Sequence, residues 1–356
     1  MTAPFRRRVH FISGFDPRGP VHYHRLYRDE AEKQSKLNGS HLSIGARKRM
    51  GDGVHRWMVE GTWPDGQAVT DYRFMAWDDV IRKYWTAQKL PSLLGYLRDI
   101  SHYVVCGAFV KLARTGKGPF YASLTPLAIA APPLVLAALV AIFAGPLSGL
   151  ASLCLALLAI HGLMRKIDIV WLTNIYAFCC AWGRAPLPDL EARLDAMAAL
   201  IAQGERDEPA DEIILAGHSV GALLAMAVMA RLLKGGTRIK LLTVGACVPM
   251  VGLMPGAVMF RRDLETLSGS PDLHWRDVAS ISDPLSFARV DPLAVCGINR
   301  RHPDRQSRKL VPFVRMFSPE KYARMKPDKL RLHFQYLMAA EIAADYDYFR
   351  LTAGPK

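Results

Sequence analysis

Residues 211–233 read DEIILAGHSVGALLAMAVMARLL and join a short apolar run, a sharp turn and a longer apolar segment. The run at 212–216 has the length and composition of a buried parallel strand, and the segment at 222–233 reads as a buried helix. Between them, the sequence GHSVG leaves Ser219 alone at the corner. The stretch therefore predicts an α/β fold in which this serine lies where a strand turns into a helix.

This corner has the G-x-S-x-G pattern, in which two glycines let neighbouring elements pass close to a nucleophile in a strained turn. The helix that follows directs its N-terminal N–H groups and its positive dipole end toward the same point. An oxyanion formed during acyl transfer would be stabilised there, with the Val220 N–H as one donor. The alternative is a strand-to-helix turn without chemistry, because so short a pattern also arises by chance.

With its strand and helix in place, the sequence resembles the α/β-hydrolase superfamily, and GHSVG is most similar to the lipase and esterase branch. The resemblance implies a membrane-anchored serine hydrolase of bacterial type, with a mostly parallel sheet flanked by helices. It also implies a catalytic triad in the chain order Ser, Asp or Glu, His. It covers about the first twenty residues and the chain from about residue 190 onward, but not the middle.

The acid of such a triad is expected at Asp283. The phrase SDPLS, at 282–286, is similar to the acid loop of class 3 lipases and follows a predicted strand at 275–282. An Asx turn before proline is the alternative interpretation. Asp277 and Asp291 are the poorer candidates, because one lies in the strand and the other further along the loop.

The general base is expected at His333, within LRLHFQYLMAAEIAADY, at the start of a helix. It follows the segment 310–317, which reads as the last strand, and hydrolases of this architecture place their histidine in that region. His302 is the second candidate. A histidine at a helix start is otherwise often a cap or a surface residue.

A second oxyanion donor is expected from the loop after the first predicted strand, at 7–13. By resemblance, Ser13-Gly14-Phe15 lies where many relatives have His-Gly-x, so the Phe15 N–H is the candidate. Ser13 departs from that pattern, and the loop at 14–19 can also be an ordinary glycine turn.

Residues 118–164 contain no Asp, Glu, Lys or Arg. The first part, 121–144, is long enough to cross a bilayer, which takes roughly 20 residues. The turn GPLSG at 145–149 separates it from a shorter second crossing at 150–164. The alternatives are a hydrophobic core hairpin, or a substrate lid that enters one leaflet. Basic residues flank both ends and predict a cytoplasmic location for them; these are Lys111, Arg114, Lys117, Arg165 and Lys166.

We therefore expect three parts. Residues 1–117 form the N-terminal part of the hydrolase core, with helices and a β-hairpin at 55–77. Residues 118–166 form a transmembrane helical hairpin, and residues 167–356 carry the triad. The apolar segment 167–182 contains Trp and Tyr, which favour a membrane interface, and is expected to lie along the surface as an amphipathic helix.

The net charge of +14 predicts an anionic partner, and the apolar hairpin favours an anionic lipid surface over nucleic acid, for which no motif is present. The basic run 300–309 is a candidate for headgroup contact, together with Arg6, Arg7, Arg8, Arg261 and Arg262. The six cysteines show no metal-ligand spacing and are expected to be scattered, reduced core residues. No cofactor or metal is expected, and the oligomeric state is left open.

Together these features predict a hydrolase of the inner (cytoplasmic) membrane, with its catalytic domain facing the cytoplasm. It would cleave a lipid or other acyl ester through an acyl-enzyme. Two alternatives remain open: an acyltransferase that uses the same triad, and an inactive membrane-anchored scaffold on a hydrolase fold.

Overall fold

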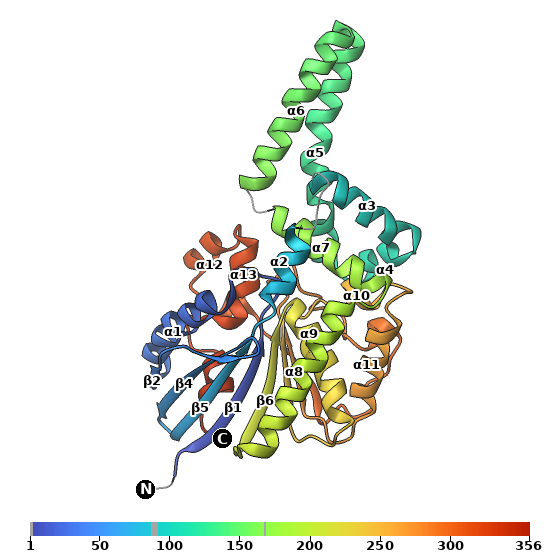
Figure 1. Cartoon of the computed structure of the whole chain (residues 1–356). Helices are drawn as coiled ribbons and strands as arrows, with labels where there is room; N and C mark the ends of the chain where they lie inside the picture. The colour runs from blue at the N-terminus through green and yellow to red at the C-terminus, as the bar shows by residue number, and fades with distance from the viewer. Residues whose placement is uncertain (1–2, 87–91, 167–168) are drawn as a thin grey trace.

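A mixed sheet organises the protein, as seen in a computed structural model that describes residues 3–86, 92–166 and 169–356 (Figure 1). In these residues nine strands pair in the order β2-β4-β5-β1-β6-β7-β8-β9, with β3 added beside β4. Six strands run parallel: β5 (Gly66–Met75), β1 (Phe5–Ile12), β6 (Glu212–His218), β7 (Lys240–Val244), β8 (Trp275–Ala279) and β9 (Gln306–Leu310). At one edge β4 (Val54–Trp63) pairs antiparallel with β5, and β2 (His41–Ile44) and β3 (Lys48–Gly51) pair antiparallel with β4.

The centre of the sheet joins chain segments from both sides of the apolar hairpin. β1 pairs with β5 on one side and with β6 on the other. Side chains along these strands alternate between two cores, as a period of two requires. Phe11 faces one core, whereas Ile12 and Leu215 face the other. The antiparallel pair β4 and β5 confirms the expected β-hairpin.

Helices cover both faces of the sheet (Figure 1). One core lies under α1 (Gly19–Asn38) and α14 (Tyr348–Ala353), beside α12 (Pro319–Met325) and α13 (Lys329–Phe334). The other lies under α8 (Pro188–Asp207), α9 (Val220–Leu233) and α11 (Val258–Gly269). Above it lie α2 (Asp78–Thr86), α3 (Ser92–Val105), α4 (Ala108–Thr115), α7 (Ile169–Arg184) and α10 (Pro249–Gly252).

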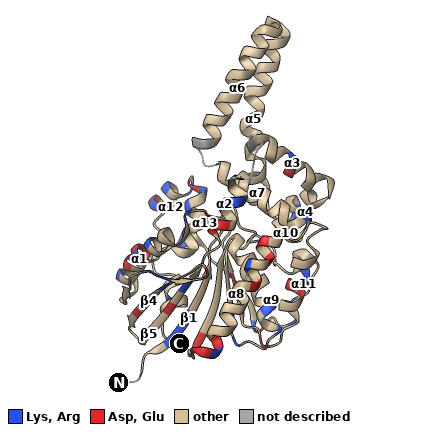
Figure 2. Cartoon of the chain, in the orientation of Figure 1, with Lys and Arg blue, Asp and Glu red and all other residues tan. Residues whose placement is uncertain are grey.

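Two long helices project from the core as a hairpin, α5 (Lys117–Ala144) and α6 (Pro146–Lys166) (Figure 1). Both are long and apolar enough to cross a membrane, and charged side chains are absent along the described length between Gly118 and Met164 (Figure 2). In their most apolar windows 11% of α5 and 22% of α6 is buried. A hairpin of a soluble core would be mostly buried, so this exposure contradicts that alternative.

Close packing joins the two helices near the turn. A Cβ built on Gly149 would lie 2.3 Å from the Cβ of Ala141, so only glycine fits at this contact. Helices in a lipid bilayer gain no hydrophobic stabilisation from contact with each other, and their association depends on close packing at small residues such as glycine and alanine. Cys154 is exposed on α6, which corrects the expectation that every cysteine lies in the core.

The structure corrects two expected elements. The segment 310–317 is not a strand: β9 ends at Leu310, and the chain then forms a short 3₁₀ turn that buries Phe313. The helix expected along the membrane surface at 167–182 is, from residue 169 onward, the core helix α7, in which Phe178 and Cys179 are fully buried; residues 167 and 168 lie outside the described part of the chain. Both segments are rich in apolar residues because they pack against the sheet layers, not because they pair as strands or face lipid.

The basic run 300–309 is also placed differently from expectation. It leads into β9, whose first residue pairs with Trp275, the first residue of β8, so the run begins at the end of the sheet that carries both chain termini (Figure 1). The hairpin extends from the opposite end. Arg7 and Arg8 are buried and form ion pairs with Glu212 and Asp71. A bilayer crossed by the hairpin would therefore lie away from these cations.

Candidate active site

Ser219 lies in a strained turn between β6 and α9. Its backbone adopts φ 57° and ψ −125°, and within the described chain it shares a positive φ with one other non-glycine residue, Asp52. Two hydrogen bonds hold this conformation: the Ser219 N–H donates to the Val244 carbonyl at 3.0 Å, and the Ser219 carbonyl accepts from the Ala222 N–H at 3.0 Å. Strain of this kind persists only where the surroundings enforce it, and it gathers at functional sites.

The two glycines of GHSVG are required by close packing. A Cβ on Gly217 would lie 2.4 Å from the Gly221 carbonyl oxygen, and one on Gly221 would lie 2.2 Å from the Ser13 carbonyl oxygen. Both contacts are with backbone, which cannot move aside. The pattern therefore has a steric reason in this fold, which places the end of β1 directly against the turn.

His333 and Asp283 form a buried pair. The imidazole Nδ1 lies 2.8 Å from Asp283 Oδ2, and each residue is 2% exposed. A carboxylate only accepts, so Nδ1 carries the proton and Nε2 is left to act as a base. The other carboxylate oxygen, Oδ1, accepts from the Leu285 N–H at 2.9 Å. Asp283 thus forms the turn suggested by Asp-Pro and also holds the imidazole. His333 lies near the end of α13, not at a helix start as expected.

Ser219 and His333 line the same cavity, which has a volume of about 20 Å³. A space of this size holds about one water molecule. No hydrogen bond joins the serine hydroxyl to the imidazole in the described part of the chain. Catalytic hydrogen bonds are often long before substrate binds. The other lining residues are mostly apolar: Pro119, Trp171, Leu172, Ile175, Tyr176, Cys247, Met250 and Leu285.

The two expected oxyanion donors lie beside the serine turn. Val220 is the first residue of α9, where the N–H has no partner within the helix. Phe15 follows Gly14, whose built Cβ would lie 3.2 Å from the Ser219 Cβ. The Phe15 N–H donates to no other group among the described residues. The Phe15 ring is buried against Trp77 and fixes this loop.

Trp171 belongs to the site, whereas the sequence predicts a membrane interface for its segment. Its indole N–H donates to the Phe15 carbonyl at 2.9 Å, and its ring lies 6.3 Å from that of His333. Trp171 lies in α7, the first helix after the apolar hairpin. It therefore links the oxyanion loop, the imidazole and the base of the hairpin.

His218 and Tyr336 support the histidine and the acid, and reasoning from the sequence missed both. The His218 Nε2–H donates to the His333 carbonyl at 2.9 Å, because a carbonyl oxygen only accepts. Complete burial, and then repulsion from the His333 ring when that ring is protonated, hold the pKa of His218 well below its usual range. The Tyr336 hydroxyl accepts from the Ser280 N–H at 2.8 Å. Burial, and then the Asp283 carboxylate, raise the Tyr336 pKa. No motif marks such contacts, since they join distant segments.

The second-choice residues are held elsewhere. Asp277 accepts from Thr243 Oγ1 at 2.7 Å and pairs with Arg308, and Asp291 pairs with Arg300. His302 lies in the loop before β9, where its carbonyl accepts from Gln306. Neither of these acids bonds to His333, and His302 does not line the cavity that contains Ser219.

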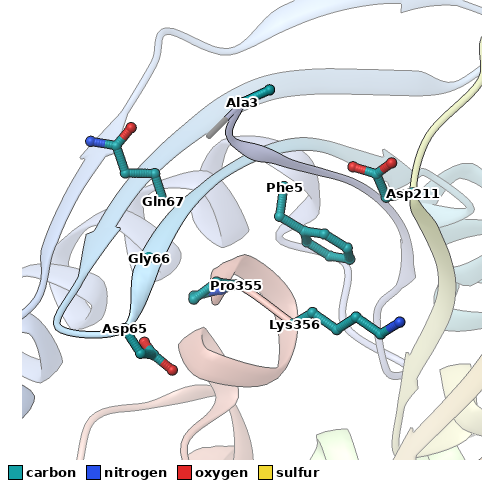
Figure 3. Close-up of a pocket in the computed structure, with 8 residues that line it drawn as sticks. All are labelled: Ala3, Phe5, Asp65, Gly66, Gln67, Asp211, Pro355 and Lys356. Atoms are coloured by element: carbon teal, nitrogen blue, oxygen red, sulfur yellow. The ribbon is translucent and has the colours of Figure 1, made fainter. Parts of the chain in front are cut away.

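Another hollow, of about 760 Å³, lies beside both chain termini and is lined by Phe5, Asp65 and Lys356 (Figure 3). None of the residues expected to act in catalysis lines it. Among the described residues, no group of three or more His, Cys, Asp or Glu side chains is arranged to hold a metal ion.

Comparison with known proteins adds no relative to this picture. No protein-family model matches the chain, and neither a curated protein nor a solved structure matches it.

Proposed function

We propose that this protein is a membrane-associated serine hydrolase of the α/β-hydrolase type, which cleaves a carboxylic ester of a lipid or another acyl compound. The observation that carries the proposal is the buried Asp283–His333 pair, whose imidazole lines one cavity with a serine in a strained strand-to-helix turn. The order Ser219, Asp283, His333 along the chain is the order used by hydrolases of this architecture.

In the proposed reaction, His333 Nε2 takes the proton of the Ser219 hydroxyl as its oxygen attacks the ester carbonyl. The N–H groups of Val220 and Phe15 stabilise the oxyanion. The protonated imidazole then gives its proton to the leaving alcohol. Water, activated by the same imidazole, hydrolyses the acyl-enzyme and releases the acid. Asp283 holds the imidazole in the productive tautomer throughout.

The walls of the cavity favour an acyl group over a polar one. Leu172, Ile175 and Met250 line it beside Ser219. A space for about one water cannot admit an acyl chain, so substrate entry requires this wall to move. The movable wall consists of the start of α5 and of α7, the segments on either side of the hairpin. An ester supplied from the bilayer fits this arrangement.

Ester hydrolysis by the purified full-length protein in detergent tests the function directly. A panel of p-nitrophenyl esters and diacyl lipids is expected to give acid and alcohol in equal amounts, because water accepts the acyl group. Added short alcohols would yield ester instead if the protein were an acyltransferase. No turnover of any ester in the panel would argue for the inactive scaffold.

The hairpin is expected to cross the inner membrane with the catalytic domain on the cytoplasmic side. In a cysteine-free background, Ser148→Cys at the hairpin turn should react with a membrane-impermeant maleimide added outside intact cells. The matched variant Ser307→Cys, on exposed β9, should react only after lysis. Equal labelling of both before lysis, or of neither, would contradict two full crossings in this orientation.

A further inference from the structure

A groove of about 250 Å³ lies beside the acid loop, at the base of the apolar hairpin. Residues from three places in the chain line it: the start of α5, the loop 281–289 after β8, and the segment formed by α12 and α13. It is separate from the cavity that contains Ser219, but Pro119 lines both.

Four exposed cations line this groove, namely Lys117, Arg289, Lys326 and Lys329. None of them pairs with a carboxylate among the described residues; the Lys329 ammonium donates to the Lys326 carbonyl. Asp283, which also lines the groove, is already occupied by His333 and by the Leu285 N–H. The groove therefore carries four cations against the single carboxylate of Asp283, and its net charge is strongly positive.

Direct contacts join the groove to the hairpin and to the acid loop. A Cβ on Gly118 would lie 2.9 Å from the Pro284 carbonyl oxygen, and one on Gly116 would lie 3.4 Å from the Phe287 ring. The base of α5 thus rests on the residues that follow Asp283. An anion bound in the groove would lie next to the wall of the Ser219 cavity, because Pro119 lines both spaces. It would also lie where the hairpin leaves the protein core.

We infer that the groove binds the phosphate of an anionic glycerophospholipid whose acyl ester reaches Ser219. This inference rests on the proposed hydrolase function and names its substrate class. Lysine ammonium groups are suited to phosphate as point charges, and anionic lipids gather at basic surfaces of membrane proteins. A diacylglycerol has no charge to place among four cations. A soluble phosphate ester could fill the groove, but it would not use the bilayer access given by the hairpin.

Binding is measured first, on the Ser219→Ala protein, so that the result does not depend on turnover. Calorimetric titration uses dihexanoyl phosphatidylglycerol below its micelle concentration, with dihexanoylglycerol as the neutral arm and glycerol 1-phosphate as the soluble arm. Adding Lys326→Gln and Lys329→Gln is expected to weaken phosphatidylglycerol binding roughly tenfold, because two charge-assisted contacts are lost. Lys234→Gln/Arg238→Gln is the matched control, since it removes two exposed charges beside the start of β7.

The second measurement is the ratio of kcat/KM for phosphatidylglycerol over diacylglycerol in the same neutral micelles. The Lys326/Lys329 double variant should lower this ratio about tenfold, and the control pair should not. Equal binding of the charged and neutral lipids, or an unchanged affinity in the double variant, would overturn the inference. Glycerol 1-phosphate binding as tightly as the lipid would also overturn it, in favour of a soluble ester. If the lipid binds in a charge-dependent way but the unmodified protein turns over no ester, the hydrolase proposal is contradicted and the inferred binding of the phosphate is not.

Discussion

Ser219→Ala is expected to lower kcat for ester hydrolysis by a factor of roughly 10⁶, to the level left by binding and the oxyanion donors alone. The substitution removes the oxygen that would form the acyl-enzyme. It keeps the backbone hydrogen bonds to Val244 and Ala222 that hold the turn. Steady-state turnover of a p-nitrophenyl ester, with circular dichroism as a check on folding, measures the effect.

Ser307→Ala provides the matched control, because this serine is exposed on β9 at the other end of the sheet. Its rate should equal that of the unmodified protein. Turnover in Ser219→Ala within about tenfold of the unmodified protein would mean that another group performs the chemistry.

Asp283→Asn is expected to reduce kcat by about 10⁴ while leaving the packing intact. The carboxylate now accepts from the His333 Nδ1–H at 2.8 Å. An asparagine amide that faced Nδ1 with its NH₂ group would move the imidazole proton to Nε2, the atom that must act as base. The other side-chain oxygen can still accept from the Leu285 N–H, so the loop should remain folded.

Asp277→Asn is the control that separates the loss of kcat in Asp283→Asn from the loss of stability expected when any buried carboxylate is replaced. Asp277 is as buried as Asp283 but bonds to Thr243 and Arg308. Its replacement should lower the thermal midpoint and change kcat little. Equal losses of kcat in the two variants would remove Asp283 from the proposed mechanism.

The parts of the fold that the sequence predicted are those set by local pattern. The strand, turn and helix around Ser219 lie next to one another along the chain, and the glycines at 217 and 221 are explained by contacts that any tight turn of this kind makes. The two helices of the apolar hairpin were also predicted from the sequence, because an uncharged run of this length is typical of helices long enough to cross a membrane. α5 ends at Ala144, directly before the expected turn, but α6 begins at Pro146, so the turn is shorter than the five residues expected at 145–149.

Contacts between segments that lie far apart in the chain could not be predicted from the sequence. Trp171 reaches Phe15, and His218 reaches the carbonyl of His333, across long stretches of chain that only the folded sheet brings together. The apolar composition of α7 suits both a membrane surface and a protein core, and hydropathy does not separate the two. β9 was missed for the opposite reason: the sequence of Gln306–Leu310 is polar, as at the edge of a sheet.

The acid and the base were predicted from chain order and from resemblance, and the structure places those two side chains in contact. Their partnership with Ser219 remains a proposal, since the serine and the imidazole share a cavity without a hydrogen bond.

The central claim is that Ser219 is an activated nucleophile. Its most direct test is to treat the purified full-length protein with a fluorophosphonate probe and to locate the adduct by peptide mass spectrometry. We predict one adduct, on the peptide that contains Ser219, which is lost in Ser219→Ala and strongly slowed in Asp283→Asn. A folded protein that forms no adduct, or one labelled at another residue, would contradict the account.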